Sequence, residues 1–218
     1  MRHSLRQFIP VILSFFCGFS SAVAATSAAS FADRIQATYE KAEDISIDFV
    51  QKTYVAVLEK EVKKKGEAKF KKPGKLAIAY AGVGGRHYVS DGKSLWYYEA
   101  GDSQVQKVKL DEESISPEAL SFLGGLGQLK RDFAVEEVEA GKLKELKPEK
   151  PQLQWLELTP LKKRSSLQWL VMGFDPDSAV AQEVFLYTDS GNLSHYIFNQ
   201  VRWNTGLPDD LFQYKKSN

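Results

Sequence analysis

The chain has 218 residues, with 29 lysines and arginines against 28 aspartates and glutamates, three histidines and one cysteine. A net charge of +1 at pH 7 argues against a nucleic-acid partner, because phosphate binding needs a concentrated cationic surface. A single cysteine excludes an intramolecular disulfide framework, so the fold must depend on its hydrophobic core.

The N-terminus has the three parts of a secretory signal. Arg2 and Arg6 form a short basic region, residues 8–19 are mostly apolar, and Ala22 and Ala24 provide small side chains for signal peptidase. The apolar run is too short for a membrane-spanning helix, which needs about 20 residues. The sequence therefore predicts export from the cytoplasm.

Cleavage is expected after Ala24 or Ala25, so residues 1–24 are the signal peptide and residues 25–218 form a single mature domain. Cleavage removes Cys17 together with two arginines, which leaves 27 basic against 28 acidic residues and a net charge of about −1. The bulky residues before Cys17 do not fit a lipoprotein signal. The mature chain is therefore expected to have neither a disulfide nor a lipid anchor of its own.

A helical pattern comes first in the mature chain. Ser30 is a suitable N-cap, and Phe31, Ile35, Tyr39 and Ala42 recur at helical spacing. These positions predict one helix with one buried apolar face.

Short strands separated by turn residues follow. The apolar period drops to two from residue 45, which predicts a long strand to about residue 57, and residues 60–65 are interpreted as a charged link, either a solvated loop or a strand end. Asp91 and Gly92 are predicted to form the type I′ turn of a hairpin. Further strands of this antiparallel meander are expected at 67–71, 75–80, 86–90, 95–98 and 104–110.

The second half begins with a helix signal and returns to strands. Ser116 and Pro117 predict a short helix to about residue 123, followed by a glycine-rich linker. No break in composition divides the chain, so one large antiparallel sheet is expected. Its later strands are predicted at 153–159, 166–172, 180–188 and 193–203.

The sequence contains no convincing catalytic or metal-binding motif. His87 and His195 have no partner at a ligand spacing, and no Gly-x-Ser-x-Gly elbow is present. Residues 82–85 resemble a phosphate loop only superficially, because a strand rather than a helix follows. Residues 175–177 lack the later ligands of a calcium loop. We therefore expect no catalytic residue, no metal and no cofactor.

Two later strands are apolar on both faces, which is unusual for a sheet with one solvated side. Leu167, Trp169 and Val171 alternate with Leu170 and Met172, and residues 184–187 repeat the pattern. One interpretation is a sandwich, or a sheet whose outer side is covered by loops. The other is an open, curved sheet whose inner face lines an apolar cavity closed by helices.

A set of short motifs along the mature chain resembles the LolA family, the periplasmic carriers of outer-membrane lipoproteins. The motifs occur in the family's order and cover nearly the whole mature length. They are Phe49-Val50-Gln51-Lys52, Gly66, Lys72-Pro73, the run Val89 to Tyr98, Gln104-Val105, Ser116-Pro117, Leu158-Thr159-Pro160, Asp189-Ser190-Gly191, Asn204 and Phe212.

The resemblance implies an α+β fold in one domain, an unclosed antiparallel β-barrel with an α-helical lid over an apolar cavity. It implies a monomeric, non-enzymatic carrier in the periplasm. Such a carrier takes lipoprotein acyl chains from an ATP-driven transporter of the inner membrane and passes them to an outer-membrane receptor. Two rivals stay open: a lipid-binding or sensor module of the same fold with different cargo, and a secreted enzyme with a carboxylate pair in the cavity.

The resemblance also suggests which residues bind lipid. Family members commonly have an arginine before the proline that is Pro73 here, thought to hold the lid, so Lys72 is the candidate latch. Strand parity leaves open whether Leu95 or Trp96 points inward. The predicted cavity residues are Ile47, Phe49, Leu76, Ile78, Leu95, Trp96 and Trp169, with Phe122, Leu123 and Leu126 on the lid.

Overall fold

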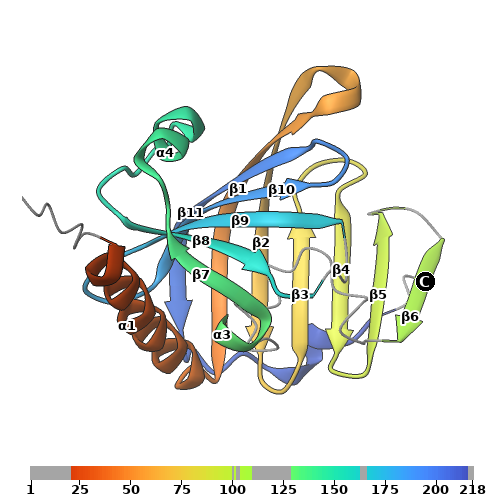
Figure 1. Cartoon of the computed structure of the whole chain (residues 1–218). Coiled ribbons are helices and arrows are strands. Elements are labelled where there is room, and N and C mark those ends of the chain that lie inside the picture. The colour runs from red at the N-terminus through yellow and green to blue at the C-terminus, as the bar shows by residue number, and fades with distance from the viewer. Residues whose placement is uncertain (1–20, 100, 102–103, 110–128, 163–165, 216–218) are drawn as a thin grey trace, which may run out of the picture.

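The structure is a computed structural model that describes residues 21–99, 101, 104–109, 129–162 and 166–215. Within these residues, eleven strands form one antiparallel sheet in the order β6-β5-β4-β3-β2-β1-β11-β10-β9-β8-β7 (Figure 1). The first six strands run outward from the centre, the last five run inward, and the pairing of β1 with β11 joins the two halves. β6 and β7 are left as free edges of the described sheet.

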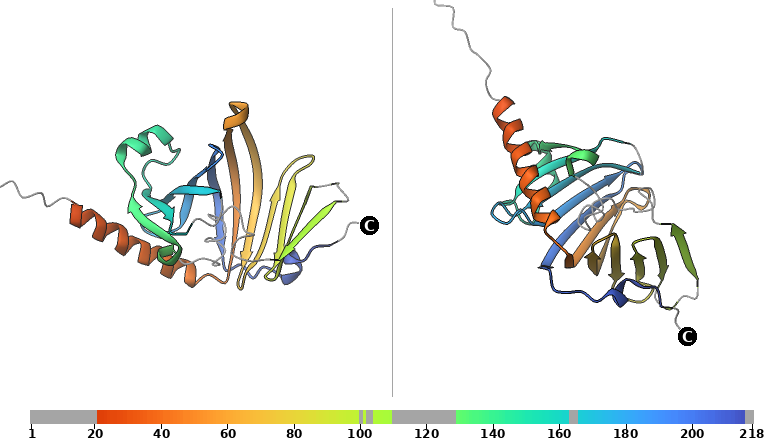
Figure 2. Two further views of the ribbon diagram at one scale, coloured as in Figure 1. Left: turned by 45° about the vertical axis from the view of Figure 1, so that its right-hand side comes forward. Right: turned by 90° about the horizontal axis from the view of Figure 1, so that it is seen from below.

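The prediction of an open antiparallel sheet with few helices is therefore confirmed. Figure 2 shows that the sheet curves strongly, as expected when twisted strands bend around a core. The strands are β1 (Asp44–Val55), β2 (Lys60–Lys71), β3 (Lys75–Tyr80), β4 (Arg86–Asp91), β5 (Ser94–Glu99), β6 (Val105–Lys109), β7 (Phe133–Glu137), β8 (Gln154–Pro160), β9 (Leu167–Phe174), β10 (Ala181–Thr188) and β11 (Leu193–Trp203).

The helices are few and mostly short. They are α1 (Ser21–Glu40), α3 (Leu129–Asp132), α4 (Ala140–Leu146) and the 3-10 turns η1 (Ala56–Leu58) and η2 (Asp209–Phe212). In the described part of the chain, no helix combines the length and the apolar character needed to cross a membrane. The helix predicted at 116–123 lies outside the described residues.

The first helix has the predicted buried face but a different start. Phe31, Ile35 and Tyr39 are almost fully buried, and the Phe31 ring packs edge-on against Phe174 at 6.1 Å between centroids. α1 begins at Ser21, so Ser30 lies inside the helix and the predicted N-cap is wrong. Alanine has the highest helix propensity, and the alanine-rich residues before Ser30 extend the helix towards the N-terminus.

Two further expectations about the first half need correction. For residues 60–65 the strand end is correct and the solvated loop is wrong, because these residues begin β2, which pairs with β1 from Lys60 to Lys71. The turn after β4 is not type I′, because only Gly92, with φ 92°, has a positive φ. The Asp91 carboxylate instead accepts the backbone N–H groups of Lys93 and Ser94, both at 2.8 Å.

The sequence patterns missed α3, β7 and α4. β7 is short and ends in two glutamates, while α4 has seven residues including a glycine. Such segments are too weak to form alone and depend on tertiary packing. α4 is stabilised by the packing of Leu143 and Leu146 against a small apolar cluster of the sheet.

The two-faced strands have apolar neighbours on both sides. On one face, Leu170 and Met172 join the main core together with α1. On the other face, Val171 and Phe185 form the second cluster, which α4 covers (Figures 1 and 2). Both interpretations of the pattern are therefore correct in part, because the outer side is covered here while the sheet as a whole stays open.

Candidate functional site

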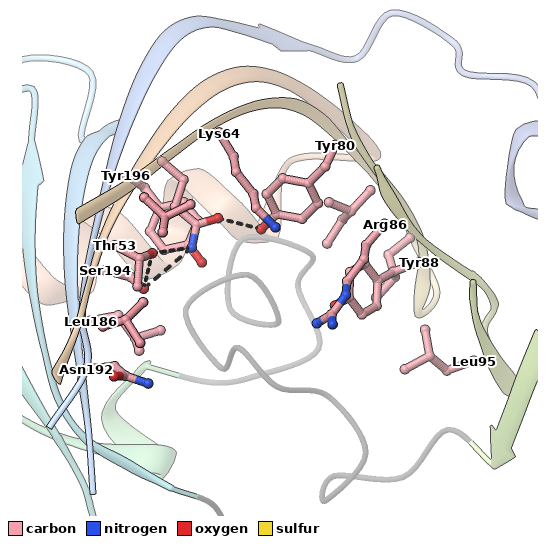
Figure 3. Close-up of a pocket in the computed structure, with 15 residues that line it drawn as sticks. Thr53, Lys64, Tyr80, Arg86, Tyr88, Leu95, Leu186, Asn192, Ser194 and Tyr196 are labelled. Carbon is pink, nitrogen blue, oxygen red and sulfur yellow. Dashed lines mark hydrogen bonds between the residues drawn. The ribbon is translucent and has the colours of Figure 1, made fainter. Parts of the chain in front are cut away.

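A cavity of about 540 Å³ opens on the concave face of the sheet, within the size range of ligand pockets (Figure 3). Strands β1 to β5 contribute one wall, and β10 and β11 contribute the other. The apolar part of the lining consists of Val55, Val62, Leu76, Ile78, Leu95 and Leu186.

Strand alternation explains why these side chains face the cavity. Leu76, Ile78 and Tyr80 alternate with Ala77 and Ala79 along β3, so the large residues share one face. Leu76 and Ile78 are 2% and 5% exposed, so both side chains are buried. The small alanines are left on the opposite face.

A chain of polar side chains forms the upper wall. The Tyr80 hydroxyl donates to Gln51 Oε1 at 2.7 Å, and Gln51 Nε2 donates to Thr53 Oγ1 at 2.9 Å. The hydroxyls of Thr53 and Ser194 are 2.9 Å apart (Figure 3). The cavity is therefore amphipathic, with a group of hydrogen-bonded polar side chains beside its apolar lining.

Two tyrosines at this wall, the partly buried Tyr80 and the buried Tyr196, are neutral over the physiological range. Burial raises the pKa of Tyr80 to about 12, only partly offset by its hydrogen bond with Tyr196. Burial also raises the pKa of Tyr196 well above its usual value. Both phenols are thus hydrogen-bonding groups rather than proton-transfer groups at neutral pH.

Three of the predicted lipid-binding residues line the cavity: Leu76, Ile78 and Leu95. Ile47 and Phe49 lie in the main core instead, 1% and 2% exposed. The Phe49 ring packs on Tyr80 and Tyr196, two of the residues that line the cavity. Phe122, Leu123 and Leu126 lie outside the described residues.

The two predicted tryptophans do not line the cavity. Trp96 stacks on Tyr214 with 6.4 Å between ring centroids, on the opposite face of β5 from Leu95. Trp169 stacks on Tyr187, and Lys142 of α4 lies 3.9 Å from its ring centroid. Both rings thus belong to the outer surface of the sheet, and strand parity is the reason.

Lys72 contacts the end of a helix. Its Nζ donates to the carbonyl oxygens of Tyr39 at 2.9 Å and of Glu40 at 2.8 Å, the last residues of α1. A cation at this position stabilises a helix, because the C-terminal carbonyls carry partial negative charge and lack intrahelical donors. The role of Lys72 as a lid latch stays a prediction, but the described contacts tie β2 to α1.

Sequence reasoning missed the polar half of the lining, which includes Lys64, Arg86, Tyr88 and Tyr196. The register explains the omission. Tyr88 pairs with Ile78, so Tyr88 and Arg86 share the inward face of β4, and only the strand pairing reveals this. Within the described residues, no group of three or more His, Cys, Asp or Glu side chains could hold a metal ion.

A curved, unclosed antiparallel sheet around a half-open cavity defines a class of binding protein built on a half-barrel. A family model described as outer membrane lipoprotein carrier protein LolA matches residues 40–215. Because this match covers most of the chain, the protein belongs to the LolA family, as the ordered motifs indicated.

Individual relatives support the assignment. The outer-membrane lipoprotein carrier protein of Chromobacterium violaceum is 28% identical over 196 residues, covering 89% of this chain and 88% of the relative. The carrier protein of the same name from Nitrosospira multiformis is 25% identical over 207 residues, covering 93% and 91%. An uncharacterized conserved protein from Thermus thermophilus shares the fold, with a TM-score of 0.51 at 11% identity over 87% of this chain and 95% of that chain.

Proposed function

We propose that this protein is a periplasmic carrier that shields the acyl chains of lipoproteins between the inner and the outer membrane. The observation that carries the proposal is the cavity inside an open sheet of a LolA-family chain. The apolar wall of Leu76, Ile78, Leu95 and Leu186 supplies the surface that an acyl chain needs. Export with removal of residues 1–24 belongs to the same proposal, as does the absence of a catalytic step.

The energetics explain why a carrier is needed. Each methylene taken out of water contributes about 0.8 kcal/mol, so a chain of about 16 carbons exposed to water costs roughly 12 kcal/mol. A membrane solvates that chain about as well as a protein cavity does. Loading therefore needs an ATP-driven transporter of the inner membrane, and unloading needs a receptor at the outer membrane that binds the cargo more tightly.

An empty apolar cavity must be protected from aggregation, which calls for a closed and an open form of the carrier. We propose that the protein works as a monomer and that Phe122, Leu123 and Leu126 belong to a lid that closes the cavity. Lys72 stabilises the closed form through its hydrogen bonds to the end of α1. The lid part of this proposal rests on the family resemblance.

The direct test is to purify the protein from the periplasm and to identify the bound lipid by mass spectrometry. The expected result is a lipid-modified N-terminal cysteine peptide of an outer-membrane lipoprotein. A different lipid in stoichiometric amount would favour a sensor or carrier with other cargo. An empty cavity, with lipoproteins reaching the outer membrane normally in a deletion strain, would contradict the proposal.

Replacing Lys72 with leucine is expected to weaken the latch. The variant loses two hydrogen bonds to the α1 carbonyls, which should lower the free energy of unfolding by about 1 kcal/mol and speed cargo release. Denaturant titration and release of fluorescent lipoprotein measure the two effects. Lys72→Arg is the matched control, because a guanidinium keeps the charge and the donors. A Lys72→Leu protein that accepts and releases lipoprotein as the parent does would disprove the latch.

A further inference from the structure

The cavity lining carries positive charge that an acyl chain alone does not require. Among the described residues that line it, Lys64 and Arg86 are cations, and no aspartate or glutamate is present. An alkyl chain gains nothing from a charged neighbour, since charges strongly prefer water to hydrocarbon. The two cations therefore indicate a second chemical requirement of the ligand.

The strand register separates Leu76 and Leu95 from the two cations of the cavity lining. Leu76 of β3 pairs with Ser90, which in turn pairs with Leu95, so the two leucines lie in one row across β3, β4 and β5. Tyr80 lies four residues farther along β3, about 13 Å away at 3.3 Å per residue. Arg86 begins β4 beside the end of β3, in the row of Tyr80.

Lys64 joins this cationic end from the next strand. Gly66 pairs with Tyr80, which places Lys64 just beyond the Tyr80 row, and its Nζ lies 5.7 Å from the Tyr80 ring centroid. Figure 3 shows Lys64 and the guanidinium of Arg86 on the cavity side of their strands. Leu76 and Leu95 thus lie at one end of the cavity and the two cations lie at and beyond Tyr80, with Val62 and Leu186 one row farther along.

Both cations are available to a ligand. Lys64 forms no ion pair with a described carboxylate, and it is exposed at the mouth of the cavity. Arg86 Nε lies 3.5 Å from Glu99 Oε1, the outer limit of a hydrogen bond, and both side chains are more than half exposed. The Arg86 side chain also forms a hydrogen bond with Tyr88, and its remaining guanidinium donors are left for another partner.

We propose that the cavity binds an anionic amphiphile, with its alkyl chain along the leucine end and its carboxylate or phosphate between Lys64 and Arg86. A guanidinium presents paired donors that match either anion, and an ammonium adds a second point charge. This inference rests on the proposed function, because it uses the same acyl-chain cavity, and it extends the ligands of that cavity to single-chain anionic amphiphiles.

The test compares ligands that differ only in head-group charge. Palmitate, methyl palmitate and hexadecyl phosphate are titrated below their aggregation limits into the mature protein, by displacement of a fluorescent alkyl probe. The two anionic ligands are expected to bind about tenfold more tightly than the ester, and added salt should reduce this preference. Millimolar inorganic phosphate should not displace palmitate, because a free anion lacks the alkyl chain.

Variants test whether the two cations cause the preference for anionic ligands over the ester. The double variant K64Q/R86Q should lose the tenfold preference for palmitate over its methyl ester. Lys63→Gln is the matched control, since Lys63 is an exposed neighbour on the opposite face of β2 and should keep the tenfold preference.

The outcomes separate this inference from the function on which it rests. Equal affinity of the parent protein for acid and ester, or an unchanged preference in the double variant, would overturn the anionic site alone. Displacement of palmitate by inorganic phosphate would overturn the assignment to an amphiphile. A parent protein that binds neither palmitate nor its ester would overturn the carrier proposal as well.

Discussion

Replacing Asp44 with alanine is expected to lower the free energy of unfolding by about 3 kcal/mol, because a buried carboxylate that accepts several hydrogen bonds is lost. Asp44 is 4% exposed. Its oxygens accept the N–H groups of Thr205 and Gly206 at 2.8 Å and that of Leu207 at 3.1 Å, together with the Thr205 hydroxyl. The truncation leaves these donors without an acceptor at the start of the C-terminal segment.

Urea denaturation of the two proteins measures this effect. Asp48→Ala is the matched control on the same strand, because Asp48 is 41% exposed and its ion pair with Arg202 should contribute less than about 1 kcal/mol. An Asp44→Ala protein as stable as the parent would show that the C-terminal segment does not depend on this carboxylate.

The same site predicts an acid dependence of stability. Burial of Asp44 raises its pKa, but the donors of Thr205, Leu207 and Gly206 together outweigh burial and lower it below the ordinary value. A depressed folded-state pKa stabilises the fold at pH values above the unfolded pKa, near 3.9, and this contribution disappears as pH falls through the folded pKa. The stability difference between the parent and Asp44→Asn should therefore narrow as the pH is lowered below about 4.

Local patterns predicted the sheet well where a strand has one buried face. The bounds of β3 and β11, at 75–80 and 193–203, agree with the structure because turn residues flank clear alternation. Residues 60–65 stayed open between a loop and a strand end because six residues rich in lysine have low strand propensity on their own. Their strand state comes from pairing with β1, and such long-range contacts are invisible to a local window.

The sequence predicted the residues of only one wall of the candidate site. Leu76 and Ile78 follow from alternation along one strand, whereas the inward choice of Leu95 over Trp96 depends on register with β4. The outward position of Trp169 depends on α4, a helix too short for its sequence to predict. Strand periodicity thus shows which residues of a strand share a face, and tertiary packing decides which of the two faces lines the cavity.

Replacing Ile78 with tryptophan is expected to abolish most binding of an acyl chain. Ile78 lies in the middle of the apolar wall, between Leu76 and Tyr80 on the same face of β3, so an indole there would occupy the path of the chain. Excluding about four methylenes costs roughly 3 kcal/mol, which corresponds to a loss of more than a hundredfold in affinity. Titration with methyl palmitate and transfer of purified lipoprotein both measure the loss.

The matched control for this prediction is Ala77→Trp, which adds the same ring to the opposite, partly exposed face of β3. Its affinity for methyl palmitate should stay within about threefold of the parent value, since no apolar contact with the chain changes. Circular dichroism of Ile78→Trp checks that the variant is folded, because a larger ring beside a side chain that is 5% exposed can cost stability. A folded Ile78→Trp protein with parental affinity would place the acyl chain outside this cavity. The proposed binding of an anionic amphiphile at Lys64 and Arg86 would then be contradicted as well.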